Sequence, residues 1–282
     1  MAKPSIYRKK ILHRLRDHSH GNVGYLELGN PAGPCVVFRH GFGADMMTWQ
    51  YCLAPLVRQY RLIALDLPGH GKTGSLSGAV SLKRMVGWLC ETLALLDIER
   101  AILVGHSMGG SLSVAFARKY PYHVVGLVLI APAGISDDFD PAPLRRFMQT
   151  GTEDEAGDLA DLLLNQKSKK LIEQIRRSLL SNRTSNRQWS ALQALLETGL
   201  SGAGPDAILI NELPCPVHVI WGCKDRLTPR PKRSQLGRNT QVKLLRSVGH
   251  LAHIEAATVV TSTISMLAAE RQSGPAGQPA YF

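Results

Sequence analysis

Residues 101–110 read AILVGHSMGG. The first four are apolar, as is typical of a short buried strand, and the stretch from Ser107 to Tyr120 has the pattern of a helix that stops before Pro121. Gly105 and Gly109 permit a tight turn between strand and helix. A serine at such a turn has an exposed hydroxyl, and the adjoining helix N-terminus favours negative charge. The stretch therefore predicts a strand, a tight turn and a helix, with Ser107 as a candidate nucleophile.

Short apolar runs and amphipathic stretches alternate on both sides of this motif. The expected strands are Tyr25–Leu28, Cys35–Phe38, Arg61–Leu65, Ala101–Val104, Val124–Ile130, Pro216–Trp221 and Gln241–Val248. Their length and their Val, Ile and Leu content suit parallel strands that are covered on both faces. Residues 82–96 have apolar side chains at helical spacing, and Ser81 stands where an N-cap would be. The alternation predicts an α/β fold with a doubly wound, mostly parallel sheet.

Residues 134–205 interrupt this alternation. They contain helical patterns but no strand-like run, at Leu144–Thr150, Glu155–Leu164, Lys169–Leu180 and Gln188–Thr198. We therefore expect a helical cap at 134–205, inserted in a core formed by 1–133 and 206–282. Within that core, 1–20 is a basic extension and 272–282 a Gly- and Pro-rich tail.

A serine hydroxyl needs a base to accept its proton. His250 follows the last expected strand, in Val-Gly-His, and loops after parallel strands gather at the edge of the sheet where Ser107 also lies. We expect His250 to be this base. His253, three residues further on, is the alternative.

The acid that would orient this base should also follow a strand. Asp225 does so, after the strand that ends near Trp221, and a carboxylate there can hold the imidazole tautomer. The alternatives are Asp137 and Asp138, further from the sheet edge. Asp66 precedes the nucleophile in the chain and is expected to anchor a loop.

Acyl transfer further requires donors for the oxyanion. One is the backbone N–H of Met108, directly after the nucleophile. The other is expected from Phe42, whose flanking glycines in His40-Gly41-Phe42-Gly43 let its N–H face a carbonyl oxygen. We expect the side chain of His40 to brace this loop, and a second base is the alternative.

Composition narrows the class of protein. The net charge of +11 is concentrated at the two ends, without a stretch that interleaves basic and aromatic residues, which argues against a nucleic-acid site. Five cysteines without a C-x-x-C fit neither a disulfide framework nor a zinc site. With no 18-residue apolar run and no signal-like start, we expect a cytoplasmic protein that needs no membrane, metal or cofactor. We expect a monomer or a homodimer.

These motifs together resemble the α/β-hydrolase superfamily over roughly residues 22–270. The segments that carry the resemblance are HGFG at 40–43, DLPGHG at 66–71, GHSMGG at 105–110, VIWGCKDRLTP at 219–229 and VGH at 248–250. The order Ser, Asp, His is that of the family. The resemblance implies eight strands with a helical cap after the sixth, a triad of Ser107, Asp225 and His250, and oxyanion donors at Phe42 and Met108.

The chain also resembles the hydrolase-like domain of acetoin dehydrogenase acyltransferase subunits, in HGFGADMMTW, RLIALDLPGHGKT and GHSMGGSLS. Its short basic N-terminus does not resemble the lipoyl domain of those subunits. Ser107 differs from the aspartate of haloalkane dehalogenases and epoxide hydrolases. Leu251 stands where carbon–carbon bond hydrolases of this superfamily usually have Trp, and Gly43 differs from the proline typical of perhydrolases.

The expected activity is hydrolysis of a carboxylic ester or related acyl bond in a small-molecule substrate. Acyl transfer from the same acyl-enzyme, carbon–carbon bond hydrolysis and non-catalytic ligand binding are the alternatives. The candidate substrate-binding side chains, which are mostly apolar, are His40, Leu144, Phe147, Met148, Leu162, Leu163, Trp189 and Leu251.

Overall fold

The computed structural model describes residues 13–77, 80–135, 142–149, 152–166, 168–181, 193, 210, 213–237 and 240–272. These residues form one sheet of eight strands in the order β1-β2-β4-β3-β5-β6-β7-β8. The strands are β1 (His13–His18), β2 (Gly21–Gly29), β3 (Cys35–Arg39), β4 (Arg61–Leu65), β5 (Ala101–His106), β6 (Val124–Ile130), β7 (Val217–Gly222) and β8 (Thr240–Leu245). Strands β1, β2 and β4 pair antiparallel, and every other pair is parallel.

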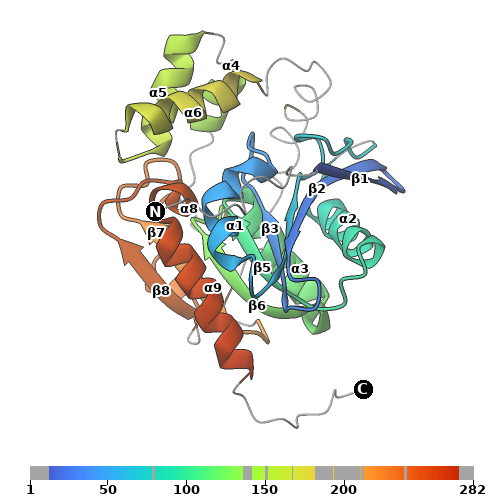
Figure 1. Ribbon diagram of the computed structural model, residues 1–282. Coiled ribbons are helices and arrows are strands. Elements are labelled where there is room, and N and C mark those ends of the chain that lie inside the picture. The colour runs from blue at the N-terminus through green and yellow to red at the C-terminus, as the bar shows by residue number, and fades with distance from the viewer. Residues whose placement is uncertain are drawn as a thin grey trace, which may run out of the picture.

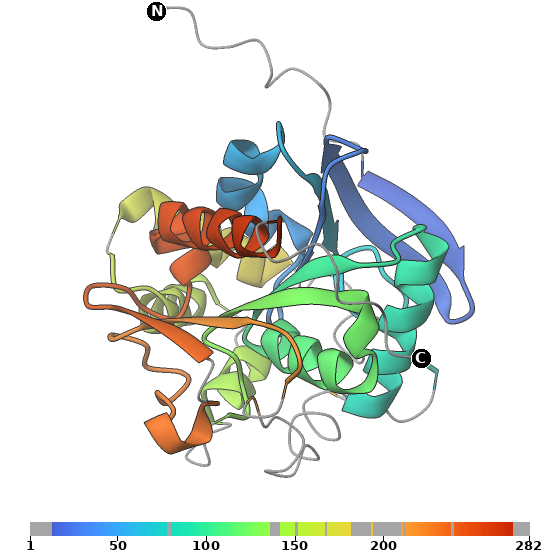
Figure 2. The ribbon, with the colours of Figure 1, turned by 90° about the horizontal axis from the view of Figure 1, so that it is seen from below.

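Helices cover both faces of the sheet and one of its edges. The described helices are η2 (Met46–Trp49), α1 (Gln50–Leu56), α2 (Leu82–Leu95), α3 (Met108–Lys119), η3 (Pro121–His123), α4 (Ala142–Gln149), α5 (Glu153–Leu163), α6 (Lys169–Ser181), η5 (Arg233–Gln235), α8 (Ala252–Glu255) and α9 (Ala257–Gln272). Figures 1 and 2 show α2 and α3 on one face and α1 and α9 on the other. Helices α4, α5 and α6 lie together at the top of Figure 1.

Successive side chains of the strands point to opposite faces of the sheet and so divide the core into two clusters. One cluster joins α2 and α3 to the sheet through side chains such as Val37 and Leu89, and the other joins α1 and α9 to it through side chains such as Leu53 and Ile264. All six residues of β5 are buried. Because two helical layers sandwich the central strands, the turn after β5 is held on a rigid support.

The sheet confirms the predicted fold class, including helices inserted after the sixth strand. Helix α2 is capped by the Ser81 hydroxyl, as predicted. Strand β1 was not predicted, because its sequence, HRLRDH, contains no apolar run. It lies within the stretch 1–20 that was expected to be a basic extension, yet it pairs with β2 in the sheet. Strands β2 and β3 follow each other along the chain but are not neighbours, since β4 lies between them.

Several predictions fall outside the described residues. These are the basic start before residue 13, the tail after 272, the acid alternatives Asp137 and Asp138, Trp189, and most of the helical run at 188–198.

All five cysteines are free, and only Cys223 among them is exposed.

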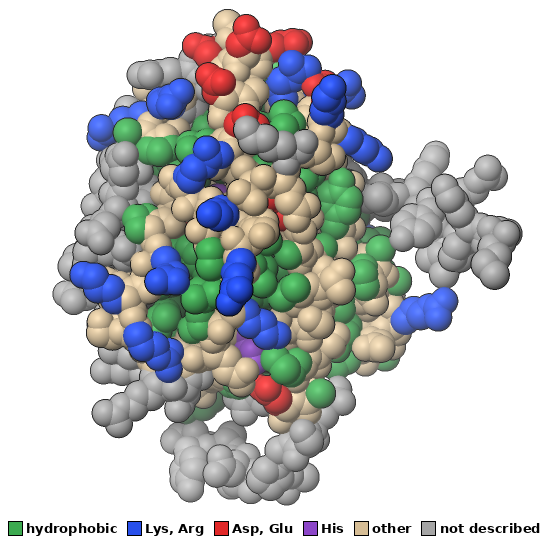
Figure 3. All heavy atoms as spheres, turned by 90° about the vertical axis from the view of Figure 1, so that its left-hand side faces the viewer, with side chains coloured by type: hydrophobic (Ala, Val, Ile, Leu, Met, Phe, Trp, Pro, Cys, Tyr) green, Lys and Arg blue, Asp and Glu red, His purple; other side chains and the backbone are tan. Residues whose placement is uncertain are grey.

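The surface carries its charges unevenly. On the face drawn in Figure 3, Lys and Arg side chains are dispersed among hydrophobic and polar ones, while acidic side chains gather at the top, over α4–α6.

Among the residues that the structure describes, no helix is both long and apolar enough to cross a membrane.

Candidate active site

Ser107 lies in the tight turn between β5 and α3. Its φ of 49° and ψ of −117° lie in a region that a residue with a Cβ rarely adopts, at a cost of about 1–3 kcal/mol. The turn is held by its neighbours, because the Ser107 N–H donates to the carbonyl of Ile130 at 2.9 Å. Such local strain, kept in place by a rigid surrounding, is typical of a functional position.

The glycines beside Ser107 allow a close approach of backbone segments. A Cβ at Gly109 would lie 2.4 Å from the carbonyl oxygen of Arg39, and one at Gly105 would lie 2.4 Å from that of Gly109. Backbone atoms of a central strand cannot move away at little cost. Close packing at this turn therefore requires glycine at both ends of the G-x-S-x-G pattern.

We predict that Gly109→Ala lowers the free energy of unfolding by about 3 kcal/mol, the upper range for overpacking a core. Gly87→Ala is the matched control, since a Cβ at Gly87 in α2 would meet nothing within 4 Å. It is expected to raise stability by up to ~1 kcal/mol through helix propensity. Urea unfolding of both variants measures the difference, and equal stabilities would contradict the packing argument.

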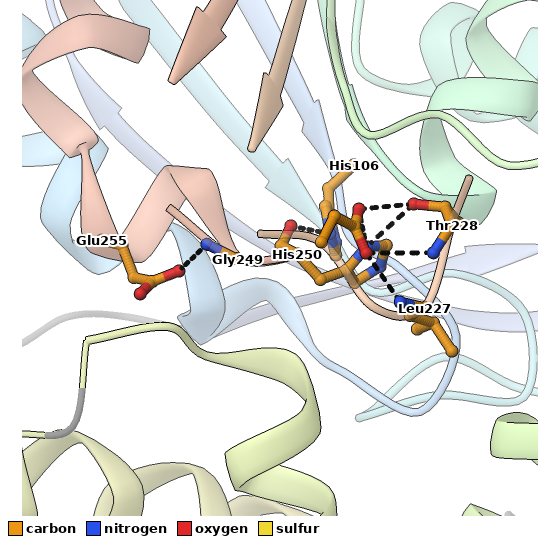
Figure 4. A network of polar contacts seen from close by, with 7 residues as sticks. His106, Leu227, Thr228, Gly249, His250 and Glu255 are labelled. Atoms are coloured by element: carbon orange, nitrogen blue, oxygen red, sulfur yellow. Dashed lines mark hydrogen bonds and ion pairs between the residues drawn. The ribbon is translucent and has the colours of Figure 1, made fainter. Parts of the chain in front are cut away.

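Asp225 and His250 form a buried pair in two loops that follow neighbouring strands, β7 and β8. The Oδ2 atom of Asp225 lies 2.8 Å from Nδ1 of His250, and their side chains are 1% and 2% exposed. Figure 4 shows His250 together with Leu227 and Thr228, the residues that contact the same carboxylate. The carboxylate also accepts the N–H groups of Leu227 and Thr228 and the Thr228 hydroxyl, at 2.8, 3.0 and 2.6 Å.

These contacts set the charge of the pair. Burial by itself would raise the pKa of Asp225, but the neighbouring imidazole of His250 and the hydrogen bonds from Thr228 outweigh it and hold that pKa below its usual range. Asp225 is therefore a carboxylate at neutral pH. A fixed carboxylate that accepts Nδ1–H leaves Nε2 of His250 as the basic nitrogen.

His250 is also held through its backbone by His106. Nε2 of His106 lies 3.2 Å from the His250 carbonyl oxygen, so it carries the proton, and the two rings lie 4.6 Å apart. On its other side, His106 packs against His253 with ring centroids 4.4 Å apart. His253 is buried, and its Nε2 lies 2.8 Å from the Thr48 hydroxyl. The structure thus puts His250, and not its sequence alternative His253, beside Asp225.

The loop after β3 is braced by two histidines. Nδ1 of His40 donates to the Gly41 carbonyl at 2.8 Å, and its Nε2 accepts the Leu67 N–H at 3.0 Å. His70 accepts the Gly43 N–H at Nε2, also at 3.0 Å. Burial lowers the pKa of His40 to about 4 and of His70 to about 3. Both rings are therefore neutral, and His40 has no nitrogen left to act as a second base.

Asp66 anchors the next loop, as predicted. It accepts the N–H groups of Met46 and Lys72 at 2.7 and 2.8 Å. Burial raises the pKa of this carboxyl to about 6, although both hydrogen bonds oppose the shift.

A cavity of about 380 Å³ joins Ser107 and His250. The side of the cavity nearest these residues is formed by the loop after β3, including Phe42. The opposite wall comes from α4, α5 and α6, and its side chains are mostly apolar. They are Pro143, Leu144, Leu159, Leu163, Gln174, Ile175, Arg177, Ser178 and Leu179.

The cavity brings together some of the predicted substrate-binding residues and leaves out others. Leu144, Leu163 and Leu251 line it. His40 does not, since it is fully buried behind the loop that it braces. Met148 packs against Leu159 instead, and the side chain of Phe147 lies outside the described set.

Sequence reasoning did not identify several residues that support the site. Thr228 lies three positions after Asp225, at a spacing that suits a turn in which a carboxylate accepts following N–H groups. His70 lies in the glycine-rich loop after Asp66. No local pattern reveals His106, whose contact with His250 spans 144 positions. In the part of the chain that is described, no three His, Cys, Asp or Glu side chains are grouped so that they could hold a metal ion.

Comparison with known proteins assigns this chain to a family. The model of the alpha/beta hydrolase family matches residues 36–262. The chain therefore belongs to the alpha/beta hydrolase family, which confirms the resemblance seen in its motifs.

One relative is an acetyltransferase component that is longer than the matched region. The chain is 29% identical over 238 residues to the dihydrolipoyllysine-residue acetyltransferase component of the acetoin cleaving system of Cupriavidus necator. That match covers 83% of this chain but 63% of the relative, so the chain spans less than two thirds of that protein.

Solved structures share the fold. A 2-hydroxy-6-oxo-6-phenylhexa-2,4-dienoate hydrolase from Rhodococcus superposes with a TM-score of 0.82 at 20% identity, covering 92% of this chain and 99% of that one. A carboxylesterase of Bacillus subtilis gives a TM-score of 0.78 at 19% identity, with 92% of each chain covered. At such identities the likeness concerns the fold alone.

Proposed function

We propose that this protein is a serine hydrolase that cleaves a carboxylic ester or a related acyl bond. The observation that carries the proposal is the buried Asp225–His250 pair, 2.8 Å apart, beside the same cavity as the strained turn of Ser107. A carboxylate, an imidazole and a hydroxyl in this relation are the three parts of a catalytic triad.

In the proposed reaction, Nε2 of His250 takes the proton of Ser107 as Oγ attacks the acyl carbon. The negative charge on the substrate oxygen is bound by the N–H groups of Phe42 and Met108. As the first residue of α3, Met108 has an N–H that the helix itself does not use. His250 then protonates the leaving alcohol, while Asp225 stabilises the imidazolium. Water, activated by the same histidine, releases the acid and restores Ser107.

The cavity supports an apolar acyl group of small to medium size. Its volume of about 380 Å³ lies at the low end of small-molecule sites. The apolar side chains of Leu144, Leu159 and Leu163 face the space above Ser107. Burial of such a chain contributes about 0.8 kcal/mol for each methylene.

Labelling with a fluorophosphonate tests the proposed nucleophile. We expect the probe to modify Ser107, as located by mass spectrometry of peptides, because only a serine activated by a base reacts readily. Ser107→Ala should remain unlabelled. A wild-type protein that takes up no probe would instead support a non-catalytic ligand-binding role.

Acyl transfer is a second candidate, favoured by the similarity to the acetyltransferase component of the acetoin system. It uses the same acyl-enzyme and differs only in the acceptor. Product analysis with an added alcohol or thiol separates the two activities. Hydrolysis predicts mainly free acid, whereas a transferase would form the new ester or thioester in preference.

A further inference from the structure

The carboxylate of Glu255 joins two parts of the chain that meet beside His250. Glu255 ends α8, and its Oε2 accepts the N–H of Gly249 at 2.7 Å. Its Oε1 accepts the N–H groups of Asn165 and Gln166, at 2.8 and 2.6 Å. One side chain therefore holds the residue before His250 and the segment that follows α5.

The end of α5 is bonded directly to the loops of the proposed acid and base. The last carbonyl groups of a helix have no partner within it. In α5, the carbonyl of Leu163 accepts the N–H of His250 at 2.9 Å, and that of Asp161 accepts the guanidinium of Arg226, the residue after Asp225. Displacing α5 would thus break a hydrogen bond made by His250 itself.

Packing at this junction leaves little room for adjustment. A Cβ at Gly249 would lie 2.7 Å from the Leu163 carbonyl oxygen and 2.9 Å from the Asn165 nitrogen. The Asn165 side chain donates to the Ser247 carbonyl at 3.0 Å, and that of Gln166 to the Glu255 carbonyl at 3.3 Å. Figure 4 shows Glu255 and its contact with Gly249 on one side of His250, and Leu227 and Thr228 on the other.

We propose that Glu255 is a positioning residue that couples the docking of α5 to the placement of His250. This inference rests on the proposed function, in which His250 is the base. With Glu255 in place, the α5 end, Gly249 and His250 move as one unit. Misplacing a catalytic group by about 1 Å can cost about 10²-fold in rate. A small displacement at this junction is therefore expected to lower the rate of turnover strongly.

Glu255→Gln is the variant that tests the coupling. Both carboxylate oxygens accept N–H groups, so an amide in either orientation turns its NH₂ toward a donor and loses at least one bond. We expect kcat to fall by about tenfold or more. The fall should be equal for p-nitrophenyl acetate and hexanoate, because His250 serves both, whereas damage confined to the cavity wall would raise KM for the longer ester.

Hydrogen–deuterium exchange gives a readout that needs no activity. In Glu255→Gln, exchange should rise together in peptides that contain 160–166 and 246–251. Glu27→Gln is the matched control, since Glu27 is also half-buried and binds Arg14 and Arg61 at 2.7 and 2.9 Å, far from this junction. It should change exchange around β2 and leave kcat as in the wild type. If Glu255→Gln does not fold, Glu255→Asp, too short to reach both segments, takes its place.

The outcomes are distinct. Faster exchange in one of the two peptides only, or an unchanged kcat, would overturn the coupling. A wild-type protein that turns over no ester would refute the proposed function, while the exchange data would still decide whether Glu255 ties the two segments together.

Discussion

Replacing Ser107 by alanine is expected to lower kcat for p-nitrophenyl acetate by about 10⁴-fold or more, toward the rate that remains when a triad loses its nucleophile. The substitution removes the atom that would attack the acyl carbon. It keeps the Cβ, so the backbone at φ 49° carries the same strain and the fold should persist. The oxyanion donors and the cavity remain, which is why binding of the ester should survive while its turnover does not.

Ser111→Ala is the matched control for this experiment. Ser111 lies one turn further along α3, is also buried, and donates its hydroxyl to the Ala133 carbonyl at 2.6 Å. Its loss should reduce stability by about 1 kcal/mol and leave kcat within a few-fold of the wild type. Activity retained in Ser107→Ala would show that another group is the nucleophile.

The predicted positions of the site residues depended on sheet topology more than on any motif. Ser107, Asp225 and His250 each follow a strand of the parallel part of the sheet, and the carboxyl ends of parallel strands share an edge. That rule needs only the strands, which short apolar runs such as AILV and VVGLVLI reveal. It therefore predicts which residues lie at this edge of the sheet without knowledge of how the loops fold.

The supporting contacts could not be predicted in the same way. His106 contacts His250 across 144 positions of the chain, and Glu255 contacts Asn165 across 90, so only the tertiary fold brings these residues together. Strand β1 was missed for a related reason. It pairs at the exposed margin of the sheet, where Arg14 and Arg16 replace the apolar residues by which a strand is recognised.

A second large effect is expected on stability in mild acid. Four buried histidines, His40, His70, His106 and His253, are neutral in the folded protein because burial lowers the pKa of each. In the unfolded chain their pKa is about 6.5. Above pH 6.5 the four rings are neutral in both states, and the protein has its full stability with respect to them. As the pH falls below 6.5, the free energy of unfolding decreases, since the unfolded chain then binds protons that the folded one does not.

One carboxyl works in the opposite direction. The pKa of Asp66 is raised to about 6 by burial, above its unfolded value of about 3.9, so the folded protein gains stability as this group takes up a proton. For these five groups the difference is about three protons between pH 6 and pH 4, which corresponds to roughly 4 kcal/mol in the free energy of unfolding for each pH unit. A loss on the order of 5 kcal/mol between pH 6.5 and pH 5 is large against the usual 5–15 kcal/mol of total stability.

Urea unfolding at pH 7.5, 6.5, 5.5 and 5.0 measures this slope. His253→Gln should make it shallower by about one proton, because an amide near Thr48 has no charge to gain. Asp66→Asn should make it steeper, because it removes the group that offsets the histidines. A free energy of unfolding that stays constant from pH 7.5 to pH 5 would contradict the argument, since it would mean that the buried rings are protonated as readily in the folded protein as in the unfolded chain. The two variants are expected to change the slope of the unfolding free energy against pH in opposite directions. General acid sensitivity would change both slopes in the same direction.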